Sequence, residues 1–261
     1  MATQLASNPT TSAIGHSEIQ PYFHAFTSNS LAITKNFQDI FDELTHYSTQ
    51  GDQLAPKWQP IMQNLTNVLA ASRNTASDIA AYCTKVTTAT LPVSADLTKT
   101  IPATLSVEVL TEYIAMTDSL GARAQATSDA FTALSNSVNA FISMFNKEQS
   151  RTISVNETYV GSKNNLQAFG AMRALEVKRQ ANMTACQRAL APVSGVNSNS
   201  QSAGFSAIWN AVKSDCTSLS SFLKIANDPV IRKYPQIFWG TLNNVNGSNT
   251  AIAEGVKLLH S

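Results

Sequence analysis

Glu43 and His46 have the spacing of a metal-binding motif. They are three residues apart, so a helix would place the carboxylate and the imidazole on one face. Helical bundles that hold two iron ions use two such Glu-x-x-His motifs and two further glutamates. This chain has four histidines and one copy of the motif, with no partner on another predicted helix. We therefore predict no metal site and interpret Asp39, Asp42 and Glu43 as an exposed acidic face.

The three cysteines, Cys83, Cys186 and Cys216, form no closely spaced pair. Their separations are not typical of a disulfide framework, so we predict reduced thiols on or near buried faces. A Cys–His nucleophilic pair need not be local in the sequence and stays open at this point. No nucleophile elbow, phosphate-binding loop or dinucleotide fingerprint occurs. The sequence therefore predicts a protein that is not an enzyme, with no catalytic residue, cofactor or small-molecule substrate.

The longest predicted element is a helix from about Ser106 to Gln149. Its mostly apolar positions follow steps of four and three, which define one face of an α-helix. A strand would need alternation at every second residue. These positions are Tyr113, Thr117, Leu120, Ala124, Thr127, Phe131, Leu134, Val138, Phe141 and Phe145. A helix of this length needs other long helices to cover its apolar face.

Similar seams predict helices before the central one. The first runs from about Ile19 to Ser48, and the second is opened by Pro56 and Pro60. Proline is tolerated in a first helical turn, because its missing N–H would have no helical partner there. The second seam also includes Ser72 and Thr75, and this small, polar level would be a bend or a hydrated layer.

The sequence Ser154-x-x-Glu157 has the form of a capping box, in which both side chains satisfy backbone N–H groups at a helix start. We therefore expect a fourth helix from Ser154 to about Ala191. Its basic residues are spread around the helix axis. That distribution favours a solvated face over a surface that lies on an anionic membrane.

Two helices are expected after a low-complexity loop over residues 192–203. Their apolar positions span residues 205–226 and 238–259. Asp228 is placed to cap a helix start, and Pro235 to break or restart a helix. Three tryptophans lie near predicted helix starts, where they would close the end of a bundle or anchor at a membrane interface. They are Trp58, Trp209 and Trp239.

These elements predict an all-α fold of five or six long helices with near-heptad seams. Such seams favour shallow helix crossings, and short turns between long helices favour antiparallel neighbours. We expect an elongated antiparallel bundle in which residues 1–18 form a flexible N-terminal arm and residues 19–261 form a single domain.

The charge is low but unevenly distributed. Charged residues make up 13% of the chain, and the formal net charge is +1. Residues 1–130 hold 11 acids and 6 bases, whereas residues 131–261 hold 6 acids and 12 bases. The two halves would pair within one chain or head to tail between chains. The bases are too dispersed to predict nucleic-acid binding.

The first residues have neither a basic region nor an apolar run, so they do not form a secretory signal. No window reaches ~18 uninterrupted apolar residues, the length that a membrane-spanning helix needs. We expect a protein that is cytoplasmic as synthesised, and release without a classical signal stays open.

The long near-heptad helices over Trp58–Val86 and Tyr113–Phe145, with few charges and abundant Ser, Thr, Asn and Ala, resemble the α-helical pore-forming toxins of the cytolysin A type. The resemblance is architectural and implies no particular functional residue. Those toxins hold an apolar tongue that enters the bilayer. The nearest stretches here are Ala103–Ala122, which is interrupted by acidic residues, and Ser137–Phe145, which is short.

Two hypotheses follow. The resemblance implies a membrane-active protein that rearranges its helices and forms oligomers on a lipid membrane. The low charge and the unequal halves imply instead a structural or interaction protein that self-assembles or binds a protein partner without membrane activity.

Overall fold

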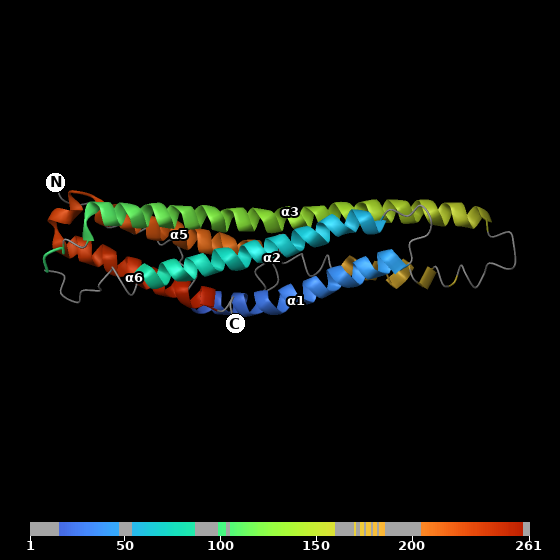
Figure 1. Ribbon diagram of the computed structural model, residues 1–261, viewed down its shortest axis with the longest axis horizontal. Helices are drawn as coiled ribbons and strands as arrows, with labels where there is room; N and C mark the ends of the chain where they lie inside the picture. Colours follow the sequence, from blue (N-terminus) through green and yellow to red (C-terminus); the bar gives the residue numbers. More distant parts are fainter. Residues whose placement is uncertain are drawn as a thin grey trace, which may run out of the picture. The chain divides into compact units, whose positions relative to one another are not determined.

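The computed structural model describes residues 16–46, 54–86, 99–102, 105–159 and 205–257, and separate helical positions between 170 and 185. Figure 1 shows the elements, and the described residues contain no strand, which confirms the all-α class. The elements are α1 (His16–His46), α2 (Leu54–Lys85), α3 (Val107–Tyr159), α5 (Phe205–Asn227), the 3-10 helix η3 (Ile231–Lys233) and α6 (Pro235–Lys257). The loop predicted over residues 192–203 lies outside the described residues.

Helix α3 is one continuous helix of 53 residues. The predicted break after Gln149 and the predicted helix start at Ser154 are therefore wrong. The segment from Gln149 to Tyr159 contains neither proline nor glycine, so no residue in it interrupts the backbone hydrogen bonds. Only positions between 170 and 185 are described from the rest of the predicted fourth helix.

The other helix boundaries lie close to those predicted. Helix α1 begins at His16, three residues before Ile19. Helix α2 begins at Leu54, and Pro60 lies inside it, near the start. At the start of α3, the N–H of Val109 donates to the hydroxyl oxygen of Ser106 over 3.3 Å. The division into an arm and one domain stays a prediction.

The chain forms two compact units, and each is built from separate stretches of sequence. Unit 1 combines residues 1–24, 75–124 and 210–261, and unit 2 combines residues 25–74 and 125–209. Helices α1, α2, α3 and α5 each supply residues to both units.

The core of unit 2 is centred on Trp58 of α2, which is fully buried. Its ring lies 4.9 Å from that of Phe37 on α1 and 4.9 Å from that of Phe141 on α3, measured between centroids. The indole N–H of Trp58 donates to the carbonyl oxygen of Phe37 over 2.9 Å. Phe131 and Phe205 make a further edge contact at 5.0 Å.

The polar level at Ser72 in unit 2 is built by a specific hydrogen bond. Ser72 is fully buried, and its hydroxyl oxygen accepts the indole N–H of Trp209 on α5 over 3.1 Å. Close by in the sequence, Thr75 is also buried. The predicted bend or hydrated layer is therefore replaced, at Ser72, by a direct side-chain contact between two helices.

The core of unit 1 joins α2, α3, α5 and α6. The hydroxyls of Tyr82 and Thr117 hydrogen-bond to each other inside it. The indole N–H of Trp239 on α6 donates to the carbonyl oxygen of Lys99 over 2.8 Å. Trp58, Trp209 and Trp239 are all buried, so in this structure their indoles pack in the cores of the two units.

The predicted seam of α3 is buried along its whole length. All ten of its positions from Tyr113 to Phe145 are buried. The seam on α2 is buried at Trp58 and from Leu65 to Val86, and only Ile61 is partly exposed. The four-three spacing thus identified the faces that pack.

Two ion pairs join the acidic and the basic half of the sequence. Lys178 pairs with Glu43 in unit 2 over 2.9 Å, and Lys224 pairs with Asp118 in unit 1 over 3.1 Å. Each pair is formed within one unit of a single chain. Opposite charges of the two halves therefore meet within the chain at these positions.

Candidate functional site

Glu43 forms an ion pair with Lys178. Its side chain is 12% exposed, and Oε1 accepts a charged hydrogen bond from Lys178. The side chain of His46 lies outside the described residues. Within the described part of the chain, no three His, Cys, Asp or Glu side chains are placed to hold a metal ion.

Cys83 on α2 and Cys216 on α5 are free thiols in the core of unit 1. Burial raises the pKa of each thiol to about 12. Both are therefore protonated at neutral pH, and a thiol in that state is a poor nucleophile. Cys186 lies outside the described residues.

One end of unit 1 carries a group of exposed apolar side chains, which we call the apolar tip. Single exposed apolar residues are normal on a protein surface, whereas several that gather at one place make a candidate interaction site. Its residues are between 44% and 59% exposed, and they come from the start of α3, the end of α5, the turn before η3, the residue between η3 and α6, and the start of α6. The members are Val107, Ile225, Val230, Tyr234 and Ile237.

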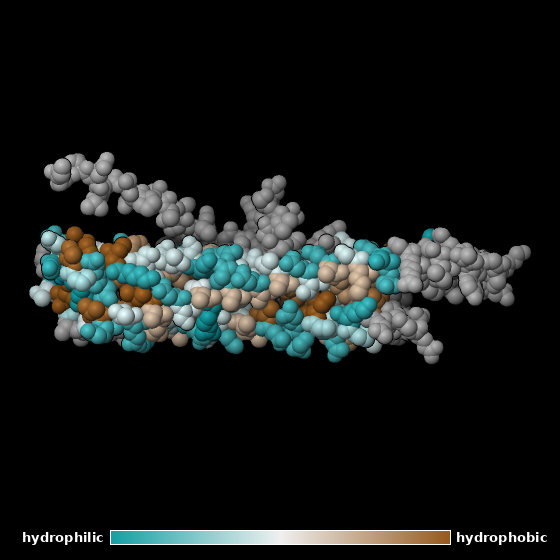
Figure 2. Space-filling model, turned by 90° about the horizontal axis from the view of Figure 1, so that it is seen from above, coloured by the Kyte–Doolittle hydropathy of each residue, from teal (hydrophilic) through white to brown (hydrophobic). Residues whose placement is uncertain are grey.

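Figure 2 shows hydrophobic surface at this end, at the left of the view, over the elements that Figure 1 draws there. The other large exposed apolar side chains among the described residues, Leu31 and Val177, belong to unit 2. The apolar tip is therefore a local feature of unit 1.

Polar contacts hold the backbone of the apolar tip in place. The side-chain amide of Asn227, at the end of α5, donates to the carbonyl oxygen of Val107 over 3.3 Å and to the hydroxyl of Thr111 over 3.0 Å. Asp228 then accepts the N–H groups of Val230 and Ile231 over 2.7 Å and 3.3 Å. Asp228 thus stabilises the turn before η3, whereas the N-cap of the 3-10 helix is Val230, which has no side-chain cap. The predicted N-cap position at Asp228 is therefore two residues too early.

Arg232 ties the turn to the segment that precedes α3. Its Nη2 donates to the carbonyl oxygen of Leu105 over 2.7 Å, and its guanidinium lies 5.5 Å from the ring centroid of Phe238. Pro235 begins α6, as its role in restarting a helix predicts. The apolar side chains thus project from a turn that is fixed by side chains on both of its flanks.

Charges of both signs surround the apolar tip. Lys99, Glu108, Asp228 and Lys233 are exposed, and Arg232 is half-buried. A hydrogen bond from Ser106 is the main cause that lowers the pKa of Glu108, and the nearby charge of Arg232 acts in the same direction. The apolar surface is therefore bordered by a nearly balanced ring of charge.

Sequence reasoning missed the apolar tip because it followed the buried seams. Ile225 and Ile237 lie off those seams, on either side of the Asp228-Pro229 turn. Isoleucine off the seam of a helix and next to such a turn marks each of these two residues in the sequence, but it does not show that they lie near Val107.

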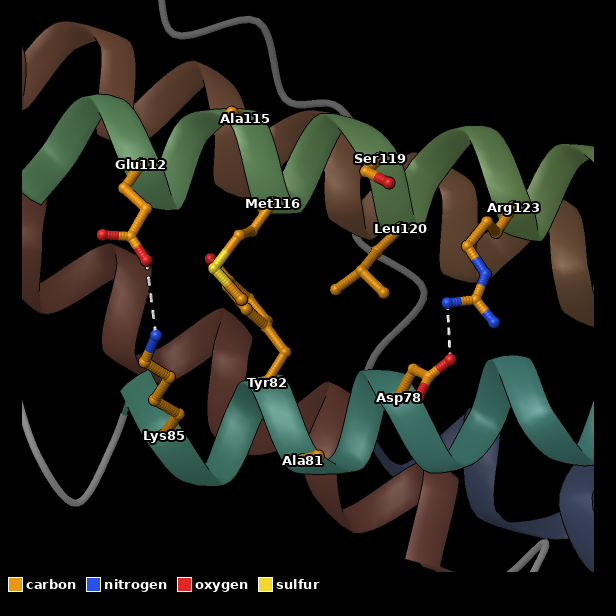
Figure 3. Close-up of a pocket in the computed structure, with 10 residues that line it drawn as sticks. All are labelled: Asp78, Ala81, Tyr82, Lys85, Glu112, Ala115, Met116, Ser119, Leu120 and Arg123. Carbon is orange, nitrogen blue, oxygen red and sulfur yellow. Dashed lines mark hydrogen bonds and ion pairs between the residues drawn. The ribbon is translucent and has the colours of Figure 1, made fainter.

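A second surface feature of unit 1 is a groove between α2 and α3, which we call the α2/α3 groove. Its volume is about 560 Å³, and Figure 3 shows Tyr82, Met116 and Leu120 between the two helices. An ion pair lies at each end, Asp78 with Arg123 and Lys85 with Glu112. Ala81, Ala115 and Ser119 add small side chains to the lining.

In the parts of the chain that the structure describes, none of the helices has both the length and the apolar content needed to cross a lipid bilayer. Comparison with known proteins gave no match to a family model, to a curated protein sequence or to a solved structure.

Proposed function

We propose that this protein is a non-enzymatic helical-bundle protein that attaches to lipid membranes through the apolar tip and forms oligomers there, as the resemblance to cytolysin-type toxins implies. The observation that carries the proposal is the convergence of five exposed apolar side chains at one fixed end of unit 1. Covering water-exposed apolar surface of this kind with a bilayer interface lowers the free energy of the system.

The bundle in this proposal is antiparallel, with near-heptad seams at its core. The register of contacts within unit 1 supports this arrangement. Asp78 on α2 pairs with Arg123 on α3, and Lys85, further along α2, pairs with Glu112, which is earlier on α3. Two antiparallel helices that are joined by one loop can move apart about that loop. The proposed oligomer on the membrane requires a rearrangement of this kind.

Membrane attachment is tested by co-sedimentation with liposomes, read beside dye release. The double variant Val230→Ser/Ile237→Ser removes apolar surface from the tip at two positions that are 59% and 49% exposed. We expect vesicle binding to fall at least tenfold and dye release to be lost, with the melting temperature nearly unchanged.

The matched control is Leu31→Ser, at a position of unit 2 that is 66% exposed on α1. It removes a similar apolar side chain from unit 2, so binding should stay as in the parent protein. Equal binding by the double variant and the control would disprove attachment through the tip. A parent protein that binds no liposome of any composition would disprove the proposed function.

A second candidate is self-assembly without lipid, and the α2/α3 groove supports it. The charges at its ends alternate in sign. If two copies met face to face with their helices reversed, Asp78 of one copy would face Lys85 of the other, and Arg123 would face Glu112. An interface with an apolar centre and a polar rim is the usual arrangement between proteins.

This alternative predicts association in solution, measured by light scattering or sedimentation. Ala115→Arg would place a long charged side chain in the groove and should abolish the association. Ala133→Arg, at an exposed alanine of the same helix outside the groove, is the control. A protein that is monomeric at high concentration without lipid would exclude the alternative.

A further inference from the structure

We infer that the apolar tip binds the interface of zwitterionic phospholipid bilayers and has no requirement for anionic lipid. This inference rests on the proposed function and specifies the lipid class that the tip recognises. It is carried by the sign, the number and the position of the charges that border the tip.

The charges around the tip nearly cancel. Lys99, Arg232 and Lys233 are basic, whereas Glu108 and Asp228 are acidic, which leaves a net charge of +1. Lys224, which precedes Ile225, is paired with Asp118 and so adds no net charge. An anionic membrane attracts each basic residue near its surface by ~1 kcal/mol, about a fivefold change in affinity. Stable electrostatic attachment uses a cluster of several bases, and this border offers no such excess.

Two of these charges are also engaged by the protein itself. Nη2 of Arg232 is bound to the carbonyl oxygen of Leu105, and the carboxylate of Asp228 is bound to two backbone N–H groups. The guanidinium also influences Glu108. Lys99, Lys233 and Glu108 are exposed. Charges of both signs fit a zwitterionic headgroup, since the ammonium groups can approach the phosphate and the carboxylate can approach the quaternary ammonium.

The same border limits how deeply the tip enters the bilayer. Glu108 directly follows Val107, and Lys233 directly precedes Tyr234. Charged side chains remain at the level of the headgroups, and tyrosine favours the same level because its ring is apolar and its hydroxyl is polar. The apolar side chains therefore reach the upper acyl region while the helix ends stay at the surface.

The test is co-sedimentation of the full chain with liposomes of phosphatidylcholine, and with liposomes in which about one-third is phosphatidylserine, at low and high salt. We expect binding to phosphatidylcholine alone, with an affinity that changes by less than about fivefold across the four conditions. Binding that needs phosphatidylserine and is lost at high salt would overturn the inference and leave the proposed function intact. Absence of binding to both compositions would instead refute the proposed function and this inference with it.

A charge variant adds a readout that does not depend on absolute affinity. Glu108→Gln raises the net charge of the border by one, and glutamine keeps the hydrogen-bonding capacity of a helix start. We expect its preference for phosphatidylserine liposomes to rise about fivefold relative to the parent protein. Glu148→Gln, at an exposed position of the same helix in unit 2, should leave the preference unchanged. Equal preferences of the two variants would show that the border of the tip does not face the lipid.

Discussion

The indole N–H of Trp209 donates to the hydroxyl oxygen of Ser72 across 3.1 Å, although the two residues are 137 positions apart in the sequence. Both side chains are fully buried in unit 2. A serine in the middle of an apolar seam thus has a defined partner on another helix. The contact satisfies a donor that would otherwise be buried without an acceptor.

Ser72→Ala should lower the free energy of unfolding by about 1–3 kcal/mol, because it leaves the buried indole N–H of Trp209 without its partner. Urea denaturation followed by circular dichroism measures this loss. Ser77→Ala, at an exposed position of the same helix, should change the stability by less than about 0.5 kcal/mol. Equal effects of the two substitutions would contradict the role given to the hydrogen bond.

Phe131→Ala should cost about 3–5 kcal/mol, and Leu134→Ala about 2–5 kcal/mol, because both side chains are fully buried on the seam of α3. Phe131 also loses its edge contact with Phe205. Asn136→Ala, on an exposed face of the same helix, is the control. An unchanged melting curve for either core variant would mean that this seam is not the packed face of α3.

The sequence was sufficient to predict the helical class and the packed faces, because four-three spacing depends only on the geometry of a helix. The end of α3 was placed incorrectly, since the capping-box pattern at Ser154 and Glu157 also occurs inside a helix. The pattern reports a helix start only where the preceding residues leave the helical conformation. Propensity alone did not reveal that the residues before Ser154 stay helical.

The apolar tip could not be predicted in the same way. Val107 and Ile225 look like ordinary helix residues in the sequence, and they are brought to one end of unit 1 by Asn227. That proximity depends on the contact between α3 and α5. The two residues that make it, Val107 and Asn227, are 120 positions apart in the sequence. Local patterns contain no information on such a contact.

Asp118 should make unit 1 more stable above about pH 4 than below it. A hydrogen bond from Ser220 over 2.6 Å is the main cause that lowers the pKa of this carboxyl group, and Lys224 adds to it. Because the carboxyl group has a lower pKa in the folded state, its contribution to stability is complete above the pKa of the unfolded state, ~3.9. The contribution is lost as the pH falls through the folded value.

Asp118→Asn tests this dependence. The side chain is 52% exposed, so solvent screens the interaction, and the variant should lose at most ~1 kcal/mol at pH 7. The difference between variant and parent, measured by urea denaturation, should be smaller at about pH 2.5, which is below the unfolded pKa of ~3.9, than at pH 7. A difference that is equally large at both pH values would show that ionisation of Asp118 does not contribute.

Cys83 and Cys216 should react very slowly with a thiol reagent in the native protein, because both thiols are buried and the pKa of each is raised to about 12. In a Cys186→Ser background, two thiols should become reactive in denaturant. If helices of unit 1 separate on a membrane, liposomes should accelerate labelling without denaturant. Rapid labelling of the native protein in the absence of lipid would contradict the buried position of these residues.

The discontinuous make-up of unit 1 has a consequence for how the protein is made. Trp239 forms a hydrogen bond with Lys99, 140 positions away in the sequence, and Ser220 forms one with Asp118, 102 positions away. The ribosome synthesises the chain from the N-terminus, so α2 and α3 emerge before α5 and α6, which complete unit 1. Unit 1 therefore completes its core only after α6 has been synthesised, and until then the apolar faces of α2 and α3 are open to aggregation.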